Sequence, residues 1–219
     1  MKKIIAIITL CILAISCNSV QFADITESFL GERLVNVTKE QKYKAKMASY
    51  KLEAKIITNK GDINLFLYPD GAPETVANFV FLCKKNFYDN MKFHRVLPNN
   101  LVQIGDNKGD TTGNAGYFIK DEITNWLNFD KAGMIAMAKN SNKDSASSQF
   151  FITLTEKQDL NGRYAVFGNL KTKQDLLVAK SIRVGDVIKD IQITGVNVND
   201  FLNNFKPEVE QWNKKLLDK

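Results

Sequence analysis

Residues 92–106, KFHRVLPNNLVQIGD, decide the fold of this chain. Two short apolar segments, residues 92–97 and 101–104, flank the turn-forming residues Pro98-Asn99-Asn100, so each segment is predicted to be a strand. Successive side chains of a strand point to opposite faces, so Leu101 and Gln103 share a face while Arg95 faces away from His94.

Upstream of this stretch, the apolar residues of positions 52–56 alternate with polar ones, and the alternation resumes at 63–67 after the turn residues NKGD at 59–62. This pattern predicts a β-hairpin. Pro73 at a helix start and Glu74 in its first turn then lead into a helix with one apolar face. That face comprises Val76, Phe79, Val80 and Cys83.

Downstream, short apolar segments recur at residues 134–138, 149–154 and 165–170, separated by clusters of Gly, Asn, Asp and Ser. A second helix is predicted at residues 173–182 and a last strand at 187–198. Many short strands with two helices indicate a mostly β fold, a closed antiparallel barrel capped at its ends.

The alternation of side chains along strands also places polar and apolar residues together on one wall. Gln149 and Phe151 share a face of their strand, as Leu101 and Gln103 do. The wall pairs a fixed cation and amides with apolar side chains, which suits binding a small ring beside a polar backbone. By default each of these residues would be an ion-pair partner, a satisfied amide or part of the core. The wall consists of Arg95, Leu101, Gln103, Gln149 and Phe151.

Composition excludes several classes of function. The chain has 219 residues and a formal charge of +6, and without Lys2 and Lys3 it has 28 basic and 24 acidic residues. The densest lysine run, at 42–46, lacks the interleaved aromatics of single-strand binders, so no nucleic-acid binding is expected. With His94 as the one histidine and Cys83 as the one cysteine beyond the leader, no metal site is expected either.

The first sixteen residues predict export. Lys2 and Lys3 precede a mostly apolar stretch, as in a secretory signal, and that stretch is shorter than the roughly 20 residues of a membrane span. The segment LAISC at 13–17 resembles a bacterial lipobox, which makes Cys17 the expected lipid anchor. Cleavage by an ordinary signal peptidase is the alternative that Ala14 and Ser16 leave open.

Two segments flank the expected domain at residues 49–198. Residues 17–48 carry no strong period and read as a tether or spacer that holds the domain away from a bilayer. In residues 199–219, Pro207 can start a helix whose Val209, Trp212 and Leu216 share a face. That helix either packs on the domain or binds a partner.

Four sequence blocks carry a resemblance to a known family. FHRVLP at 93–98, QIGD at 103–106, SQFFI at 148–152 and VFG at 166–168 resemble, in order and spacing, the signature blocks of the cyclophilins. The resemblance runs from about residue 52 to 195. It implies an eight-stranded barrel with two capping helices, peptidyl-prolyl cis/trans isomerase activity without a cofactor or metal, and binding of X-Pro-containing polypeptides.

The resemblance also implies roles for single residues. Arg95 resembles the catalytic arginine, Gln103 the glutamine beside the substrate carbonyl, and Gln149 a supporting amide. The other positions that the family uses to bind substrate are Leu101, Phe151 and Leu160 for the proline pocket, Ala138 and Lys139 for backbone contacts with an extended peptide, and Tyr164 at the pocket rim.

Three positions depart from the family pattern. Asn100 stands where the family usually has a phenylalanine of the proline pocket, and the lost contacts are expected to cost about 1–3 kcal/mol of substrate binding. Asp159 replaces a tryptophan associated with cyclosporin, so binding of that drug is expected to be weakened. Ile104 replaces a usual glycine, which bears on the local backbone geometry.

The expected chemistry needs no proton transfer. Rotating a peptide bond meets a barrier of about 18–20 kcal/mol, while the two X-Pro isomers differ by about 0.5–1 kcal/mol. A guanidinium aimed at the proline nitrogen of the twisted amide lowers this barrier and leaves the balance between the two isomers unchanged. A serine hydrolase is not expected, since no nucleophile-elbow motif accompanies His94.

The leading hypothesis is therefore a monomeric, membrane-anchored lipoprotein of the periplasm or cell surface that accelerates X-Pro isomerisation in exported proteins. Its first alternative is a binding module for proline-containing peptides that turns over poorly because of Asn100. Its second is a surface lipoprotein that binds a partner through its tether and tail.

Overall fold

The computed structural model describes residues 38–216. The leader expected at 1–16, the lipidation site Cys17 and the first part of the tether lie outside this range. No helix within residues 38–216 is both long enough and apolar enough to cross a membrane.

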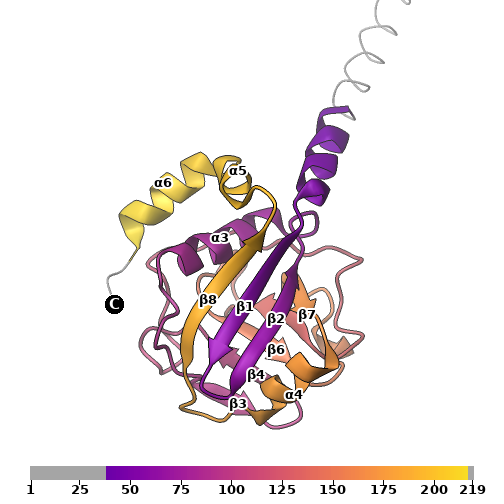
Figure 1. Ribbon diagram of the computed structural model, residues 1–219. Helices are drawn as coiled ribbons and strands as arrows, with labels where there is room; N and C mark the ends of the chain where they lie inside the picture. The colour runs from indigo at the N-terminus through magenta and orange to yellow at the C-terminus, as the bar shows by residue number, and fades with distance from the viewer. Residues whose placement is uncertain (1–37, 217–219) are drawn as a thin grey trace, which may run out of the picture. The chain divides into compact units, whose positions relative to one another are not determined.

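One antiparallel sheet of eight strands forms the body of the domain (Figure 1). β1 (Leu52–Thr58) and β2 (Gly61–Leu67) form the predicted hairpin, with Ile56 paired to Ile63. The strand order is β3-β4-β6-β5-β7-β2-β1-β8. The other strands are β3 (Arg95–Leu97), β4 (Leu101–Ile104), β5 (Met134–Met137), β6 (Phe150–Thr153), β7 (Val166–Leu170) and β8 (Ile188–Gly195).

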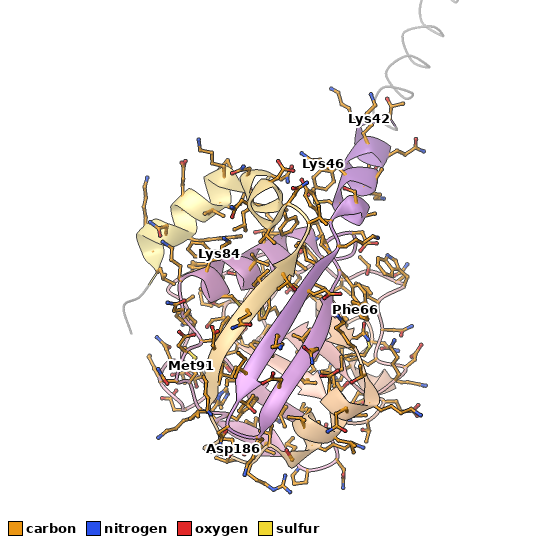
Figure 2. All side chains as sticks on the ribbon, in the orientation of Figure 1. Lys42, Lys46, Phe66, Lys84, Met91 and Asp186 are labelled. Carbon is orange, nitrogen blue, oxygen red and sulfur yellow. The ribbon has the colours of Figure 1, made fainter. Side chains whose placement is uncertain are left out.

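The prediction of a closed barrel needs a correction, because the sheet is a curled half-barrel with β3 and β8 at its edges. β3 has three residues, and its ladder is with β4. The segment before β3 instead meets the start of β8 through a bridge between Lys92 and Val187. The N–H of Ile188 also donates to the carbonyl of Met91 at 2.9 Å. Met91 and Asp186, which mark this edge of the sheet, are labelled in Figure 2.

The two predicted helices are present as α3 (Pro73–Lys84) and α4 (Lys173–Ser181). α3 is buried from Thr75 to Cys83, and its Phe79 packs between the rings of Tyr88, Phe150 and Phe167 in the core. Burial raises the pKa of the Cys83 thiol well above its usual value. Cys83 is thus a small apolar core residue, as predicted.

α3 is capped from a distant part of the chain. Ala72 at its N-cap offers no side-chain oxygen, and the carboxylate of Glu122 accepts the N–H groups of Glu74 at 3.0 Å and Thr75 at 2.7 Å. These two donors would otherwise lack a partner, as the first N–H groups of a helix do. The loop that contains Glu122 is therefore attached to the core helix.

Part of the segment predicted to be a tether is helical. The helix comprises residues 38–49, in a stretch where the sequence shows no strong periodicity up to residue 48. Lys, Glu, Gln, Ala and Met favour a helix even without an apolar stripe. Lys44 also pairs with Glu40 one turn earlier, at 2.7 Å.

The C-terminal extension comprises α5 (Val198–Asn203), which the sequence did not predict, and α6 (Lys206–Lys215). Trp212 is buried, and Val209 and Leu216 pack against the same core. The shared apolar face of these residues is therefore covered by the domain itself, which favours the packing explanation for the tail over the partner-binding one.

Asp175 stabilises the junction of α4 with the hairpin. Its carboxylate accepts hydrogen bonds from the backbone and side chain of Thr172 and from the backbone and side chain of Asn64, at 2.6–2.9 Å. Burial opposes ionisation of Asp175, but the bonds from Thr172 and Asn64 outweigh it and lower the pKa of this carboxyl. A lowered pKa means that the charged form stabilises the folded state.

We expect Asp175→Asn to lower the free energy of unfolding at pH 7 by about 1.5–3 kcal/mol, the range for hydrogen bonds to a charged group. The stabilisation is present above the unfolded pKa of about 3.9 and is lost as pH falls through the lower folded pKa. Urea unfolding at pH 7 and pH 2 should therefore show the deficit shrinking on acidification. Asp62→Asn, which breaks an exposed pair with Lys55, is the control, and an equal deficit at both pH values contradicts the assignment.

Candidate active site

One pocket of about 770 Å³ gathers every predicted catalytic and substrate-binding residue. The residues come from β3, β4 and β6, from the positions just before β4 and β6, from the loop after β5, and from the segment between β6 and β7. The predicted residues that line it are Arg95, Asn100, Leu101, Gln103, Ala138, Lys139, Gln149, Phe151, Leu160 and Tyr164.

A relay of three side chains forms the polar wall. Arg95 lies directly opposite Gln103 in the β3–β4 ladder, and its Nη1 donates to Gln103 Oε1 at 3.0 Å. Gln103 Nε2 in turn donates to Gln149 Oε1 at 2.8 Å. Gln149 Nε2 ends the relay on the carbonyl oxygens of Gly113, at 2.8 Å, and Thr111, at 3.1 Å. Backbone carbonyls thus fix the orientation of both amides, and the amides hold the guanidinium.

The apolar part of the pocket is a small cluster separate from the main core. Phe151 stacks on Phe129 at 5.9 Å and meets the edge of Tyr164 at 5.3 Å. Leu101 belongs to the same cluster, and Leu160 packs against it. The result is a ring-sized apolar site directly beside the polar relay, as side-chain parity predicted.

The three departures from the family pattern have different structural effects. Asn100 is half-buried in the pocket lining, while the Asp159 side chain is 63% exposed and pairs with Lys157 at 3.1 Å. Ile104 is buried in the main core and pairs with Phe150, so β4 remains regular at this position. Asn100 and Asp159 therefore change the pocket, and Ile104 does not.

Ala138 and Lys139 lie at the edge where an extended peptide was expected. The Ala138 N–H donates to the carbonyl of Gln149 at 2.9 Å, so it is not available to a peptide. The backbone groups that remain for an extended peptide are therefore the carbonyl of Ala138 and the backbone of Lys139. The Lys139 ammonium pairs with Asp121 at 2.6 Å, and both side chains are mostly buried.

Asp121 joins two loops at this edge, in what we call the Asp121 clamp. Its carboxylate accepts from Lys139 and from the N–H of Asp144 at 3.1 Å, and its own N–H donates to Asp144 Oδ1 at 2.8 Å. The adjacent residue, Glu122, caps α3 as described above. Sequence reasoning missed this clamp, because nothing in the local pattern pairs residue 121 with residue 139.

Other lining residues were also missed, and all of them except Leu97, the last residue of β3, lie in loops. The carbonyls that end the relay lie in the segment GDNKGDTTGN at 105–114, whose composition predicts a turn but not its place beside the pocket. A Cβ atom on Gly113 would lie 1.9 Å from Asp106 Oδ1, so glycine is required there. The missed residues are Leu97, Thr111, Thr112, Gly113, Asn114, Phe118, Asn140, Ser145, Ser147 and Lys157.

Acid–base and metal chemistry have little support at this site. His94 is half-buried, its burial lowers its pKa, and it is not among the residues that line the pocket. Across residues 38–216 no three His, Cys, Asp or Glu side chains are grouped to hold a metal ion. The arrangement offers fixed hydrogen-bond donors beside an apolar pocket.

We expect Asp121→Ala to lower the free energy of unfolding by about 2 kcal/mol, somewhat less than the 3–5 kcal/mol for a fully buried pair. The cause is that Lys139 loses its counter-ion while it remains mostly buried. The double variant Asp121→Ala/Lys139→Ala should recover part of the loss in urea unfolding. Glu40→Ala, which breaks an exposed pair, is the control, and strictly additive losses would show that the clamp carries no coupling.

Comparison with known proteins agrees with this geometry. The sequence model of the cyclophilin type peptidyl-prolyl cis-trans isomerase/CLD family matches residues 53–198. The chain is 40% identical over 140 residues to peptidyl-prolyl cis-trans isomerase B of Bacillus subtilis, covering 64% of this chain and 96% of the relative. It is 39% identical over 138 residues to a peptidyl-prolyl cis-trans isomerase of Helicobacter pylori, covering 63% and 84%.

A solved structure shares the fold. A Cryptosporidium parvum cyclophilin type isomerase, crystallised in the presence of the dipeptide Ala-Pro, superposes with a TM-score of 0.61 at 32% identity. The match covers 65% of this chain and 98% of the other. Together with the family match and the pocket, this shows that the chain belongs to the cyclophilin-type peptidyl-prolyl cis-trans isomerases.

Proposed function

We propose that this isomerase acts on X-Pro bonds of exported proteins and that Arg95 provides the electrostatic stabilisation. The observation that carries the proposal is the relay from Arg95 through Gln103 to Gln149, held beside a ring-sized apolar pocket. A proline ring fits the apolar part while its imide bond lies against the relay.

The relay suits stabilisation of a twisted amide. Rotation breaks the amide resonance, which costs about 18–20 kcal/mol, and it returns a lone pair to the proline nitrogen. A guanidinium donor forms a stronger hydrogen bond to that lone pair than to the nitrogen of the planar ground state. It therefore lowers the rotation barrier without tighter substrate binding. Because Gln103 and two backbone carbonyls already fix the donor chain, little reorganisation is needed during rotation.

Gln103 holds the other side of the peptide bond. One N–H of its amide donates to Gln149, and an amide nitrogen carries two N–H groups. The second N–H is the donor that we assign to the substrate carbonyl. The peptide would continue along the carbonyl of Ala138 and the backbone of Lys139, an edge that the Asp121 clamp holds in place.

Asn100 reduces the apolar area of this pocket relative to the family pattern, with an expected cost of about 1–3 kcal/mol in substrate binding. Since Phe151, Leu101 and Tyr164 still form an apolar site, we propose slower turnover rather than loss of activity. The alternative function, a module that binds proline-containing peptides without turning them over, rests on the same residue.

The cis-to-trans rate of an X-Pro test peptide tests the proposal. We expect Arg95→Ala to lower kcat/KM by about 100-fold or more, the usual loss for one donor to a transition state. Arg183→Ala is the control, because Arg183 bonds the backbone of Lys180 and Ile182 and does not line the pocket. Wild-type-like activity in Arg95→Ala would refute the assigned role.

Asn100→Phe separates the two functions in the same assay. A wild-type chain that is inert, together with an active Asn100→Phe, would identify a binding module that descends from an isomerase. A wild-type chain that is active and an Asn100→Phe that is more active would support the enzyme with a weakened pocket.

We further propose that Cys17 carries a lipid anchor that keeps this enzyme at the extracytoplasmic face of a membrane. The support is the sequence LAISC at 13–17 after a basic start and an apolar stretch. In a bacterial host fed a labelled fatty acid, the chain should take up the label, Cys17→Ser should abolish it, and Cys11→Ser should retain it. Release of an unlabelled wild-type chain would indicate an ordinary signal peptidase instead.

A further inference from the structure

The C-terminal extension reaches beyond the family match at residues 53–198 and still contributes to the core. In Figure 1 α5 and α6 lie on the side of the domain that α3 occupies. Trp212 of α6 is 3% exposed and contacts two rings. One is Phe81 of α3 at 5.8 Å, and the other is Tyr117, stacked at 5.6 Å with 11° between the planes.

Tyr117 belongs to the loop that forms one side of the active-site pocket. Its neighbours Asn114 and Phe118 both line the pocket, and the Phe118 side chain is exposed. Gly116, between them, has a φ of +89°, a conformation that allows the chain to turn and that few other residues adopt. The ring of Tyr117 is thus the buried anchor of a loop that otherwise faces solvent and substrate.

A chain of buried hydrogen bonds continues from Tyr117 to the pocket. The Tyr117 hydroxyl donates to Asn78 Oδ1 at 2.7 Å, and Asn78 Nδ2 donates to the carbonyl of Ser147 at 2.7 Å. Ser147 lines the pocket, and its Oγ accepts the N–H of Ala115 at 3.0 Å. Trp212 therefore covers a ring whose position is linked to both sides of the pocket loop.

The extension has a second attachment, on Tyr50, which precedes β1. Phe201 of α5 is buried and meets the ring of Tyr50 edge-on at 5.2 Å. The Tyr50 hydroxyl donates to Asp200 and accepts from Asn204 Nδ2 at 3.0 Å. The two attachments are separate, so they can be perturbed one at a time.

We propose that the C-terminal extension braces the pocket loop at residues 113–119, and that Trp212 is a positioning residue for peptide binding. The proposal rests on the isomerase function given above. Removing the indole leaves one face of Tyr117 uncovered, so the loop loses its anchor while Arg95 and Gln103 keep the strand positions that hold them. Gln149 keeps its bonds to Gln103 and to the Thr111 carbonyl, and only its bond to Gly113 reaches the loop. Binding of the peptide should then weaken more than catalysis.

Three variants of the full chain test this. We expect Trp212→Ala to raise KM for an X-Pro peptide by about 5-fold, the low end of coupling between separate sites, and to change kcat by less than KM. Trp212→Phe keeps an aromatic ring against Tyr117 and should restore most of the affinity. Phe201→Ala is the matched control, because it removes a buried aromatic from the other attachment of the same extension.

Amide hydrogen exchange gives a readout that does not depend on activity. In Trp212→Ala the N–H groups of Ala115, bonded to Ser147, and Ile119, bonded to Ala146, should exchange faster, while amides of the β1–β2 hairpin should not. In Phe201→Ala these loop amides should keep their protection.

Two results would overturn the brace. One is a Trp212→Ala protein with unchanged KM and unchanged exchange in the loop, and the other is equal changes in Trp212→Ala and Phe201→Ala, which would make the extension a general stabiliser. An inactive wild-type chain would instead count against the proposed function. In that case the exchange result still decides whether the tail braces the loop.

Discussion

The pairing of β4 with β6 is the constraint on which the rest of the site depends. Gly105 directly follows β4 and has a φ of +96°, and a Cβ atom there would lie 2.2 Å from the carbonyl oxygen of Ser148. The backbones approach this closely because Ser148 Oγ also donates to the Gly105 carbonyl at 2.7 Å. This contact sets the register that brings Gln103 within hydrogen-bond distance of Gln149, and so determines where the guanidinium lies.

The same strands serve two different interiors. On one face Val102, Ile104, Phe150 and Ile152 enter the main core with Phe79 and Phe167, while on the other Leu101 and Phe151 form the pocket cluster. Period-two alternation therefore separates stability from recognition within the same few residues. A large change in the main core acts on folding, whereas a change such as Asn100 acts on the pocket.

Much of this could be predicted from the sequence, because the deciding signals are local. The alternation of apolar and polar residues located the hairpin, and short apolar segments located β4 and β6. Side-chain parity placed Arg95, Gln103 and Gln149 on one wall. The mostly β, eight-stranded fold was predicted correctly, and only the full closure of the barrel was not, because β3 has three residues and its ladder is with β4 alone. The helix at 38–49 has no apolar stripe, so the local sequence pattern did not predict it. The Asp121 clamp joins residues 18 apart in loops without periodicity, so the local sequence could not predict it either.

Cys83 shows how burial decides the chemistry of a reactive group. Its thiol lies on the buried part of α3, in the main apolar core, and burial raises its pKa well above the usual value. Almost no thiolate therefore forms at neutral pH. Thiolate is the species that attacks disulfides, and here it is both scarce and inaccessible. For the exported clients proposed above, whose cysteines would be oxidised outside the cytoplasm, Cys83 is therefore a poor partner for mixed disulfides.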